Sequence, residues 1–331
     1  MRTSIERSLA LRMGIAVVAL PVALLGFVAA IWAVFVGLLL FFRMSLSTAT
    51  TVAVVPTVGV VLAVAFLESY GTSMSDRAGN ATPVSPEDEP ELHATVNRVA
   101  SMLDVPKPTV AVSDSPAPEA MVVGTRPSSV RLVLSRGTLE ALDAAELEAV
   151  VAHELAHVKN RDAAVMTVIS VPTVLAVGLV ARFPELSRRD LTTAVALAIV
   201  GLVGAVVTRS IVAVCSRTRE LAADKAAAEV LGSGAPLASA LRTLDRRIYE
   251  TPSEDLRDVR SVSSLSILPL ESRDEPLTYW EEAETEPFLW SIRRPLSRLF
   301  RTHPPTEERI ERLAAAESDR AADHGTTRRS R

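Results

Sequence analysis

The 331-residue chain contains little cysteine, little lysine and few aromatic residues. Its single cysteine, Cys215, excludes an internal disulfide and a metal knuckle built from several cysteines. Any metal site must therefore use histidine and carboxylate side chains. Lysine occurs at only three positions, a bias that we attribute to the base composition of the gene.

The sequence also lacks a concentration of positive charge. The formal net charge is -4 and the pI is about 5.8, and the arginines form no stripe that could follow a phosphate backbone. Nucleic acid is therefore not an expected partner. Hydrophobic residues make up 48% of the chain but aromatic residues only 4%, so the apolar content is mostly alanine, valine and leucine in long runs. Such runs suit a lipid bilayer better than a compact soluble core.

Four apolar runs approach or exceed the roughly 20 residues that span a bilayer. They cover residues 9–42, 48–67, 163–180 and 191–207. We expect two transmembrane hairpins, with a buried helical pair as the alternative for the second. The first run is longer than one span, so it must tilt, project beyond the lipid or break near Pro21. A cleaved signal peptide has a shorter apolar core, so we expect this segment to be retained.

The remaining sequence predicts a soluble domain in two parts. Residues 91–103 have helical spacing, and residues 109–112, 120–123 and 130–134 predict short strands. Composition then predicts an N-terminal transmembrane hairpin at 1–69, a polar linker at 70–90 and the first part of the soluble domain at 91–162. A second apolar hairpin follows at 163–208. The second part of the soluble domain covers 209–317 with a mobile insertion at 250–286, and a disordered tail covers 318–331.

Arginine and lysine near the spans indicate an orientation. If residues 70–160 face the cytoplasm, more cations lie inside than outside, although three arginines share one outer loop. The inner set is Arg2, Arg7, Lys159, Arg161, Arg209, Arg217 and Arg219, and the outer set is Arg43, Arg182, Arg188 and Arg189. We therefore expect a multi-pass plasma-membrane protein whose soluble domain is cytoplasmic.

The segment His153-Glu154-Leu155-Ala156-His157 carries the clearest chemical signal. Asp143 and Glu146 predict the start of its helix as a capping box. Residues four apart share a helix face, so both histidines can bind one metal ion, for which zinc is the best match. Glu154 can then act as general base for the water that attacks a peptide carbonyl.

A simpler interpretation is a helix whose histidines and glutamate are merely solvated. The apolar neighbours of the motif argue against it, because unligated polar groups would be costly to bury among them.

A second helix supplies candidates for the third ligand that a catalytic zinc requires. Glu220 and Asp224 are four residues apart, so Glu220 can complete the coordination while Asp224 accepts a hydrogen bond from a histidine. Taken alone, this helix would be interpreted as an exposed acidic face pairing with Arg217 or Arg219.

Three histidines lie outside the motif. His93 and His324 have polar neighbours and are expected at the surface. His303 precedes a proline-started, acid-rich helix and could be only an entry to that helix.

Together these segments resemble the HtpX family of membrane zinc metalloproteases, which is related to the CAAX prenyl endopeptidases. The resemblance covers most of the chain: the N-terminal hairpin, the HExxH helix ending in Asn160-Arg161-Asp162, two further apolar runs, Arg219-Glu220-x-x-Ala223-Asp224, and His303-Pro304-Pro305 with Arg309. It implies a predominantly α membrane protein with four transmembrane helices and a gluzincin-like zinc metalloprotease domain with a small β-sheet.

The resemblance also implies roles for single residues. One Zn²⁺ per chain would be bound by His153, His157 and Glu220, with Glu154 as the base and Asp224 supporting a histidine. His303 and Arg309 would border the substrate cleft and help to stabilise the oxyanion. One departure is Glu119, which replaces the usual asparagine of the edge strand; backbone pairing with a peptide remains possible there.

The expected function is zinc-dependent hydrolysis of peptide bonds in misfolded or damaged membrane proteins, a quality-control and stress-response role that follows from the resemblance. Its partners would be protein substrates and the lipid bilayer. One alternative is processing of specific lipidated or precursor proteins, which predicts a chamber enclosed by more spans. Another is a non-catalytic membrane scaffold stapled by metal. The sequence indicates neither the natural substrate nor the oligomeric state.

Overall fold

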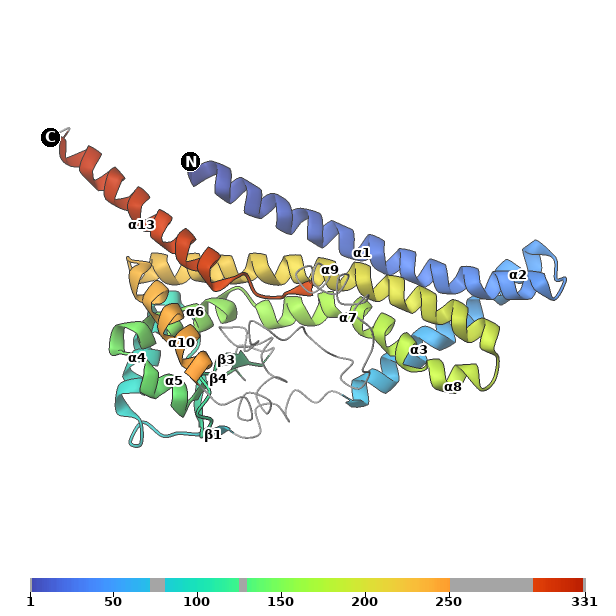
Figure 1. Cartoon of the computed structure of the whole chain (residues 1–331), viewed down its shortest axis with the longest axis horizontal. Helices are drawn as coiled ribbons and strands as arrows, with labels where there is room; N and C mark the ends of the chain where they lie inside the picture. The colour runs from blue at the N-terminus through green and yellow to red at the C-terminus, as the bar shows by residue number, and fades with distance from the viewer. Residues whose placement is uncertain (1, 72–80, 125–129, 251–299, 330–331) are drawn as a thin grey trace. The chain divides into compact units, whose positions relative to one another are not determined.

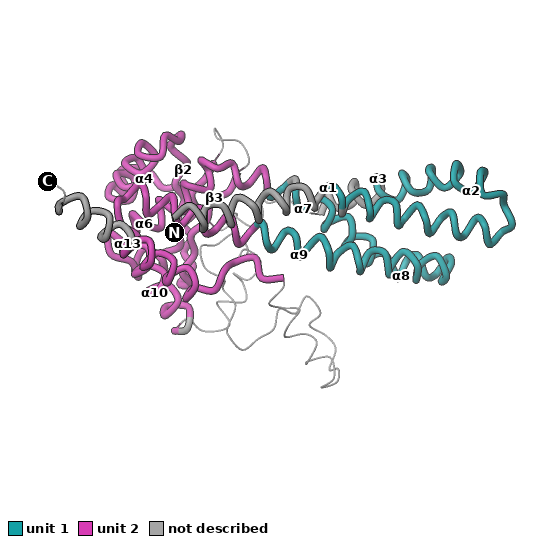
Figure 2. The backbone as a smooth tube through the Cα atoms, turned by 90° about the horizontal axis from the view of Figure 1, so that it is seen from above, with its two compact units in different colours: residues 1–73, 166–215 teal, residues 74–165, 216–331 magenta. Residues whose placement is uncertain are grey.

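The computed structural model describes residues 2–71, 81–124, 130–250 and 300–329. The chain divides into two compact units, coloured teal and magenta in Figure 2. The first unit comprises Met1–Ser73 and Met166–Cys215, and the second comprises Met74–Val165 and Ser216–Arg331. The predicted mobile insertion at 250–286 lies almost wholly outside the described residues.

The first unit is entirely helical where it is described. Helix α1 (Arg2–Phe41) continues through Pro21, and α2 (Leu46–Val52) and α3 (Val54–Gly71) follow. The second apolar run is thus split just before Pro56. Proline has no N–H to donate to the carbonyl of Val52, so α2 ends there and the chain restarts with the proline in the first turn of α3.

Helices α7 (Asp162–Ala181) and α9 (Leu191–Val230) belong partly to each unit, and the short α8 (Phe183–Ser187) lies between them. The sequence predicts a membrane helix ending near residue 207 and a separate helix from about 210. The structure joins them into one 40-residue α9, drawn as one continuous ribbon in Figure 1. No proline or glycine lies between residues 205 and 231 to interrupt the hydrogen-bond ladder.

Among the described residues, three helices are long and apolar enough to cross a membrane. They are Leu24–Phe41 within α1, Asp162–Ala181 and Leu191–Val230. The exposure of large hydrophobic side chains in these segments, including Leu25, Phe41 and Ile199, is what a lipid-facing surface requires.

The second unit contains a four-stranded sheet. Its strands are β1 (Ala81–Pro83), β2 (Thr109–Ser113), β3 (Ala120–Val123) and β4 (Arg131–Ser135), in the order β1-β2-β4-β3. The central pair β2 and β4 is parallel, with Val110 opposite Leu132, and both outer strands are antiparallel to their neighbours. The sequence predicts the last three strands but not β1, which pairs within the supposed polar linker.

The core of this unit lies between the sheet and several helices. Its members include buried side chains of α4 (Pro90–Leu103), α6 (Ala144–Lys159), α10 (Ala235–Glu250) and α13 (Thr306–Arg329). The short α5 (Arg136–Ala141) follows β4 directly. A Cβ on Gly137 would lie 2.1 Å from the carbonyl oxygen of Pro116, so only glycine fits this crossing.

The backbone of α13 is helical as far as Arg329, where the sequence predicts a disordered tail from 318.

Candidate metal centre

Helix α6 presents the HExxH motif from within the core. Its first turn is closed by the predicted capping box: the backbone N–H of Glu146 donates to Asp143, and the backbone N–H of Asp143 donates to Glu146. Apolar residues around the motif bury its polar groups, so that His153 is 0% and Glu154 2% exposed. Buried groups of this kind require partners.

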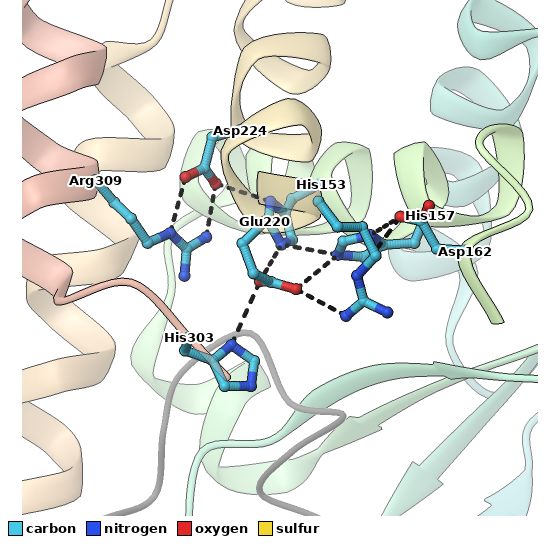
Figure 3. A network of polar contacts seen from close by, with 8 residues as sticks. His153, His157, Asp162, Glu220, Asp224, His303 and Arg309 are labelled. Carbon is cyan, nitrogen blue, oxygen red and sulfur yellow. Dashed lines mark hydrogen bonds and ion pairs between the residues drawn. The ribbon is translucent and has the colours of Figure 1, made fainter. Parts of the chain in front are cut away.

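Glu220 of α9 meets the two histidines of α6 (Figure 3). The Nε2 atoms of His153 and His157 are 3.2 Å apart. The carboxylate oxygens of Glu220 lie 3.5 Å from Nε2 of His153 and 3.6 Å from Nε2 of His157. The 3.5 Å distance is to Oε2 and the 3.6 Å distance to Oε1, and one ligand atom from each of the three residues lies within 4.8 Å of the other two.

These spacings fit a tetrahedral metal ion. Ligands about 2.0–2.1 Å from zinc are separated from one another by roughly 3.3–3.4 Å. Within the described part of the chain, Glu220 Oε2 is buried without a hydrogen-bond partner. A buried carboxylate oxygen left in this state is costly unless a cation binds it. His153, His157 and Glu220 thus form a group that can hold a zinc ion.

The other nitrogen of each imidazole faces a carboxylate. Nδ1 of His153 lies 2.9 Å from Asp224, and Nδ1 of His157 lies 2.6 Å from Asp162. A carboxylate at this position favours a proton on Nδ1, which leaves the Nε2 lone pair free for a metal. Both histidines are therefore held in the tautomer and orientation that a ligand needs.

Burial and charge shift the acid–base properties of the motif. Burial raises the pKa of Glu154 to about 8. Burial lowers the pKa of His157, whereas for His153 the same effect is outweighed by the nearby carboxylates of Asp224 and Glu220, and the pKa rises to about 9. At neutral pH the metal-free centre therefore binds a proton on His153 and another on Glu154.

The charges of the centre would be balanced by a divalent cation. Four carboxylates and two guanidinium groups are gathered here, which gives a net charge of -2 when all are ionised and the imidazoles are neutral. One zinc ion would neutralise this charge, and in its absence the two protons do so. The groups are Glu154, Asp162, Glu220, Asp224, Arg219 and Arg309.

His303 and Arg309 reach the centre from the C-terminal part of the chain (Figure 3). His303 is 5% exposed, and its Nδ1 lies 3.5 Å from Glu220 Oε2. Both of its ring nitrogens are buried without a hydrogen bond among the described residues. Arg309 is 0% exposed and donates through Nε and Nη2 to Asp224, at 2.8 and 2.6 Å. Arg309 therefore supports Asp224, which in turn contacts His153.

Sequence reasoning assigned no site role to two residues of this network, Asp162 and Arg219. A signal for Asp162 was available, since a carboxylate just past the end of the motif helix can turn back toward His157. The expectation of a surface His93 is wrong: the residue is 7% exposed and its Nε2 lies 3.0 Å from the carbonyl oxygen of Val84. The side chain of His324 lies outside the described part of the structure.

Glu119, the departure from the family pattern, precedes the edge strand β3. Its side chain is 7% exposed, and burial raises its pKa. Its backbone N–H donates to the hydroxyl of Ser135 at 2.8 Å, while the backbone N–H of Ser135 donates to its carbonyl. The strand entry is thus anchored to β4, and β3 keeps one edge without a strand partner in the described sheet.

Comparison with known proteins agrees with this centre. The pattern of peptidase family M48 matches residues 86–317. Protease HtpX homolog 1 of Streptomyces coelicolor is 36% identical over 320 residues, covering 93% of this chain and 92% of that protein. Protease HtpX homolog of Moorella thermoacetica is 32% identical, covering 79% of this chain and 85% of that protein.

Among solved structures, the crystal structure of S. mikatae Ste24p gives a TM-score of 0.43 at 18% identity. The match covers 92% of this chain and 66% of that one. This likeness is too low to support a statement about fold or activity. The M48 pattern and the HtpX homologues span most of the chain, and together they show that it belongs to peptidase family M48, as a membrane metalloprotease of the HtpX group.

Proposed function

We propose that the chain is a zinc-dependent endopeptidase of the gluzincin type, in which His153, His157 and Glu220 bind one zinc ion. The observation that carries the proposal is the approach of His153, His157 and Glu220 in a buried, negatively charged centre, where one ligand atom from each residue lies within 4.8 Å of the other two. When bound, zinc supplies the Lewis acid that polarises the peptide carbonyl and lowers the pKa of water.

The side chains around the ion divide the remaining work. Glu154 accepts the proton of the attacking water and delivers it to the leaving nitrogen. Asp224, held by Arg309, keeps the His153 imidazole oriented. His303 donates a hydrogen bond to the oxyanion, which would satisfy a ring nitrogen that has no protein partner among the described residues.

The role of His303 can be separated from a purely structural one. If it stabilises the oxyanion, His303→Ala should lower kcat by about 10–1,000-fold while zinc content and melting temperature stay near wild type. Normal turnover would show that His303 has no catalytic role. A lower melting temperature together with lower turnover would assign it a structural role.

We further propose that the substrates are misfolded or damaged membrane proteins and that the centre faces the cytoplasm of a four-span plasma-membrane protein. The names of the relatives support a protease, and the three candidate spans support a membrane location, with α2 and α3 together as the fourth span. The substrate class follows from the resemblance to the HtpX family, and the orientation from the distribution of arginine and lysine. With Cys215 replaced, single cysteines at Ser85 and Ser187 should label from opposite sides of the membrane. Labelling of both from one side would refute the second hairpin.

The activity itself is tested on the full chain in detergent. Purified protein should contain one zinc ion and cleave casein or an unfolded membrane protein. A chelator should abolish cleavage, and added zinc should restore it. Absence of zinc uptake, or cleavage that survives complete metal removal, would overturn the proposed function.

A further inference from the structure

Arg219 closes a ring of contacts around one half of the metal centre. Its Nη2 donates to Glu220 Oε1 at 2.9 Å, and its Nε lies 3.7 Å from Asp162 Oδ2. The same Oδ2 contacts Nδ1 of His157 at 2.6 Å, and Nε2 of His157 faces the same Glu220 Oε1 at 3.6 Å. The ring of contacts thus begins and ends at Glu220 Oε1, and it joins α6, α7 and α9.

The two arginines of the centre are arranged differently. Arg309 directs two nitrogens to a single carboxylate, that of Asp224, and so fixes its plane. Among the described residues, Arg219 instead hydrogen-bonds only Glu220, a member of the proposed ligand set, and lies at ion-pair distance from Asp162, the carboxylate that faces His157. Its side chain is 13% exposed, so the ring is shielded from most of the solvent that would weaken it.

We propose that Arg219 is a positioning residue that holds His157 and Glu220, the former through Asp162, in the arrangement that binds the metal. The inference rests on the proposed function, because it assigns Arg219 to the same centre. The planar, forked guanidinium suits this task, since it reaches two acceptors at fixed angles whereas a lysine ammonium acts as a point charge.

Charge alone gives the opposite expectation. A cation beside the centre repels a divalent metal, so removing Arg219 for purely electrostatic reasons would tighten zinc binding. If Arg219 positions the ligands, the loss of the ring outweighs that repulsion and zinc binding weakens. Replacement by lysine separates the two effects, because it preserves the charge and removes the fork.

The experiment compares Arg219→Lys, Arg219→Gln and Asp162→Asn with wild type and with Lys225→Gln. Lys225 is a matched control on the same helix, since its side chain is 51% exposed and its Nζ lies 3.8 Å from Glu229, which is also about half exposed. Zinc affinity is measured by chelator competition, and the visible spectrum of the cobalt-substituted protein reports ligand geometry. Melting of the metal-free proteins detects any general loss of fold.

We expect Asp162→Asn to weaken zinc binding by about 10–100-fold and both Arg219 variants by about tenfold, with altered cobalt spectra. The double variant Asp162→Asn with Arg219→Lys should bind no more weakly than the worse single variant, since both break one ring. Lys225→Gln should match wild type.

Wild-type affinity and spectrum in Arg219→Lys, or tighter binding in Arg219→Gln, would overturn the inference while leaving the proposed function intact. Full additivity in the double variant would also overturn it. A wild-type protein that takes up no zinc would instead refute the proposed function.

Discussion

Helix α6 buries two glutamates, one in its first turn and one in the metal centre, and their surroundings differ. Glu146, at the first turn, is 7% exposed and accepts hydrogen bonds from the Ser239 and Thr243 hydroxyls at 2.6 and 3.1 Å, as well as from the backbone of Asp143. Glu154, two turns later, is 2% exposed, and burial raises its pKa to about 8. Neutral donors satisfy the carboxylate of Glu146, whereas the raised pKa of Glu154 allows that carboxylate to gain and lose a proton near neutral pH.

Both glutamates are buried, so burial alone does not distinguish a carboxylate with a structural role from one with a catalytic role. The surrounding groups do distinguish them. Neutral donors on α10 stabilise the charge of Glu146 and tie two helices together. Glu154 lies in a centre with three other carboxylates; burial is the main cause of its raised pKa, and the charge of Glu220 raises the pKa further.

The largest expected effect follows from replacing each glutamate by its amide. Glu154→Gln should lower proteolysis by about 100–10,000-fold, because the general base is lost, while zinc content stays near one. Glu146→Gln should leave kcat within about threefold and lower the free energy of unfolding by about 1–3 kcal/mol, through its lost hydrogen bonds. Activity assays and thermal melts on both variants measure the contrast, and full activity in Glu154→Gln would exclude this mechanism.

Removing a proposed ligand should lower the affinity for zinc directly, and activity should fall because the metal is lost. Glu220→Ala deletes one of three donors and should weaken zinc binding by more than about 100-fold, exceeding the effect of changing a supporting residue. The same applies to His153→Ala and His157→Ala. Chelator competition measures the affinity, and unchanged zinc stoichiometry in Glu220→Ala would assign the third ligand elsewhere.

Proton competition should make zinc binding strongly dependent on pH. The pKa of His153 rises from 6.5 to about 9 and that of Glu154 from 4.5 to about 8 in the metal-free fold. Since both are raised, the stability that their protons give the metal-free protein falls as pH rises from about 4.5 to 9.

Zinc binding expels both protons, so its affinity should increase by about 100-fold per pH unit near pH 7. Calorimetry in buffers of different ionisation enthalpy counts the protons released. Glu154→Gln should release about one instead of two, and an unchanged count would show that Glu154 is already ionised in the metal-free protein.

A smaller effect than the loss of a ligand is expected from changing the residue that supports His153. Asp224→Asn should weaken zinc binding by about 10–100-fold without abolishing it, because the Nδ1 contact of His153 loses its charge. Arg309 would then face a neutral amide, so the melting temperature should also fall. Wild-type affinity in this variant would show that Asp224 does not orient the imidazole.

Much of this centre could be predicted because its signals are local in the sequence. The capping box at Asp143, the i, i+4 spacing of His153 and His157, and the spacing of Glu220 and Asp224 each lie within one or two helical turns. Three of the four strands followed from short β-branched runs bounded by turn residues. The first strand was missed because its three residues, Ala81–Pro83, contain a proline and follow a polar segment.

By itself, the sequence determined which residues share a helix face, where the motif helix begins and which segments are apolar enough for lipid, because these depend on periodicity and composition. Only the tertiary structure decided that Asp162 faces His157, that Arg309 is paired with Asp224 and that Arg219 bridges two carboxylates. Those contacts join helices up to 85 residues apart in the chain. The contact between Asp162 and His157 is local, but the pairing of Arg309 with Asp224 and of Arg219 with Asp162 depends on the packing of distant segments, which buries several charges together in a space where each needs an opposite charge.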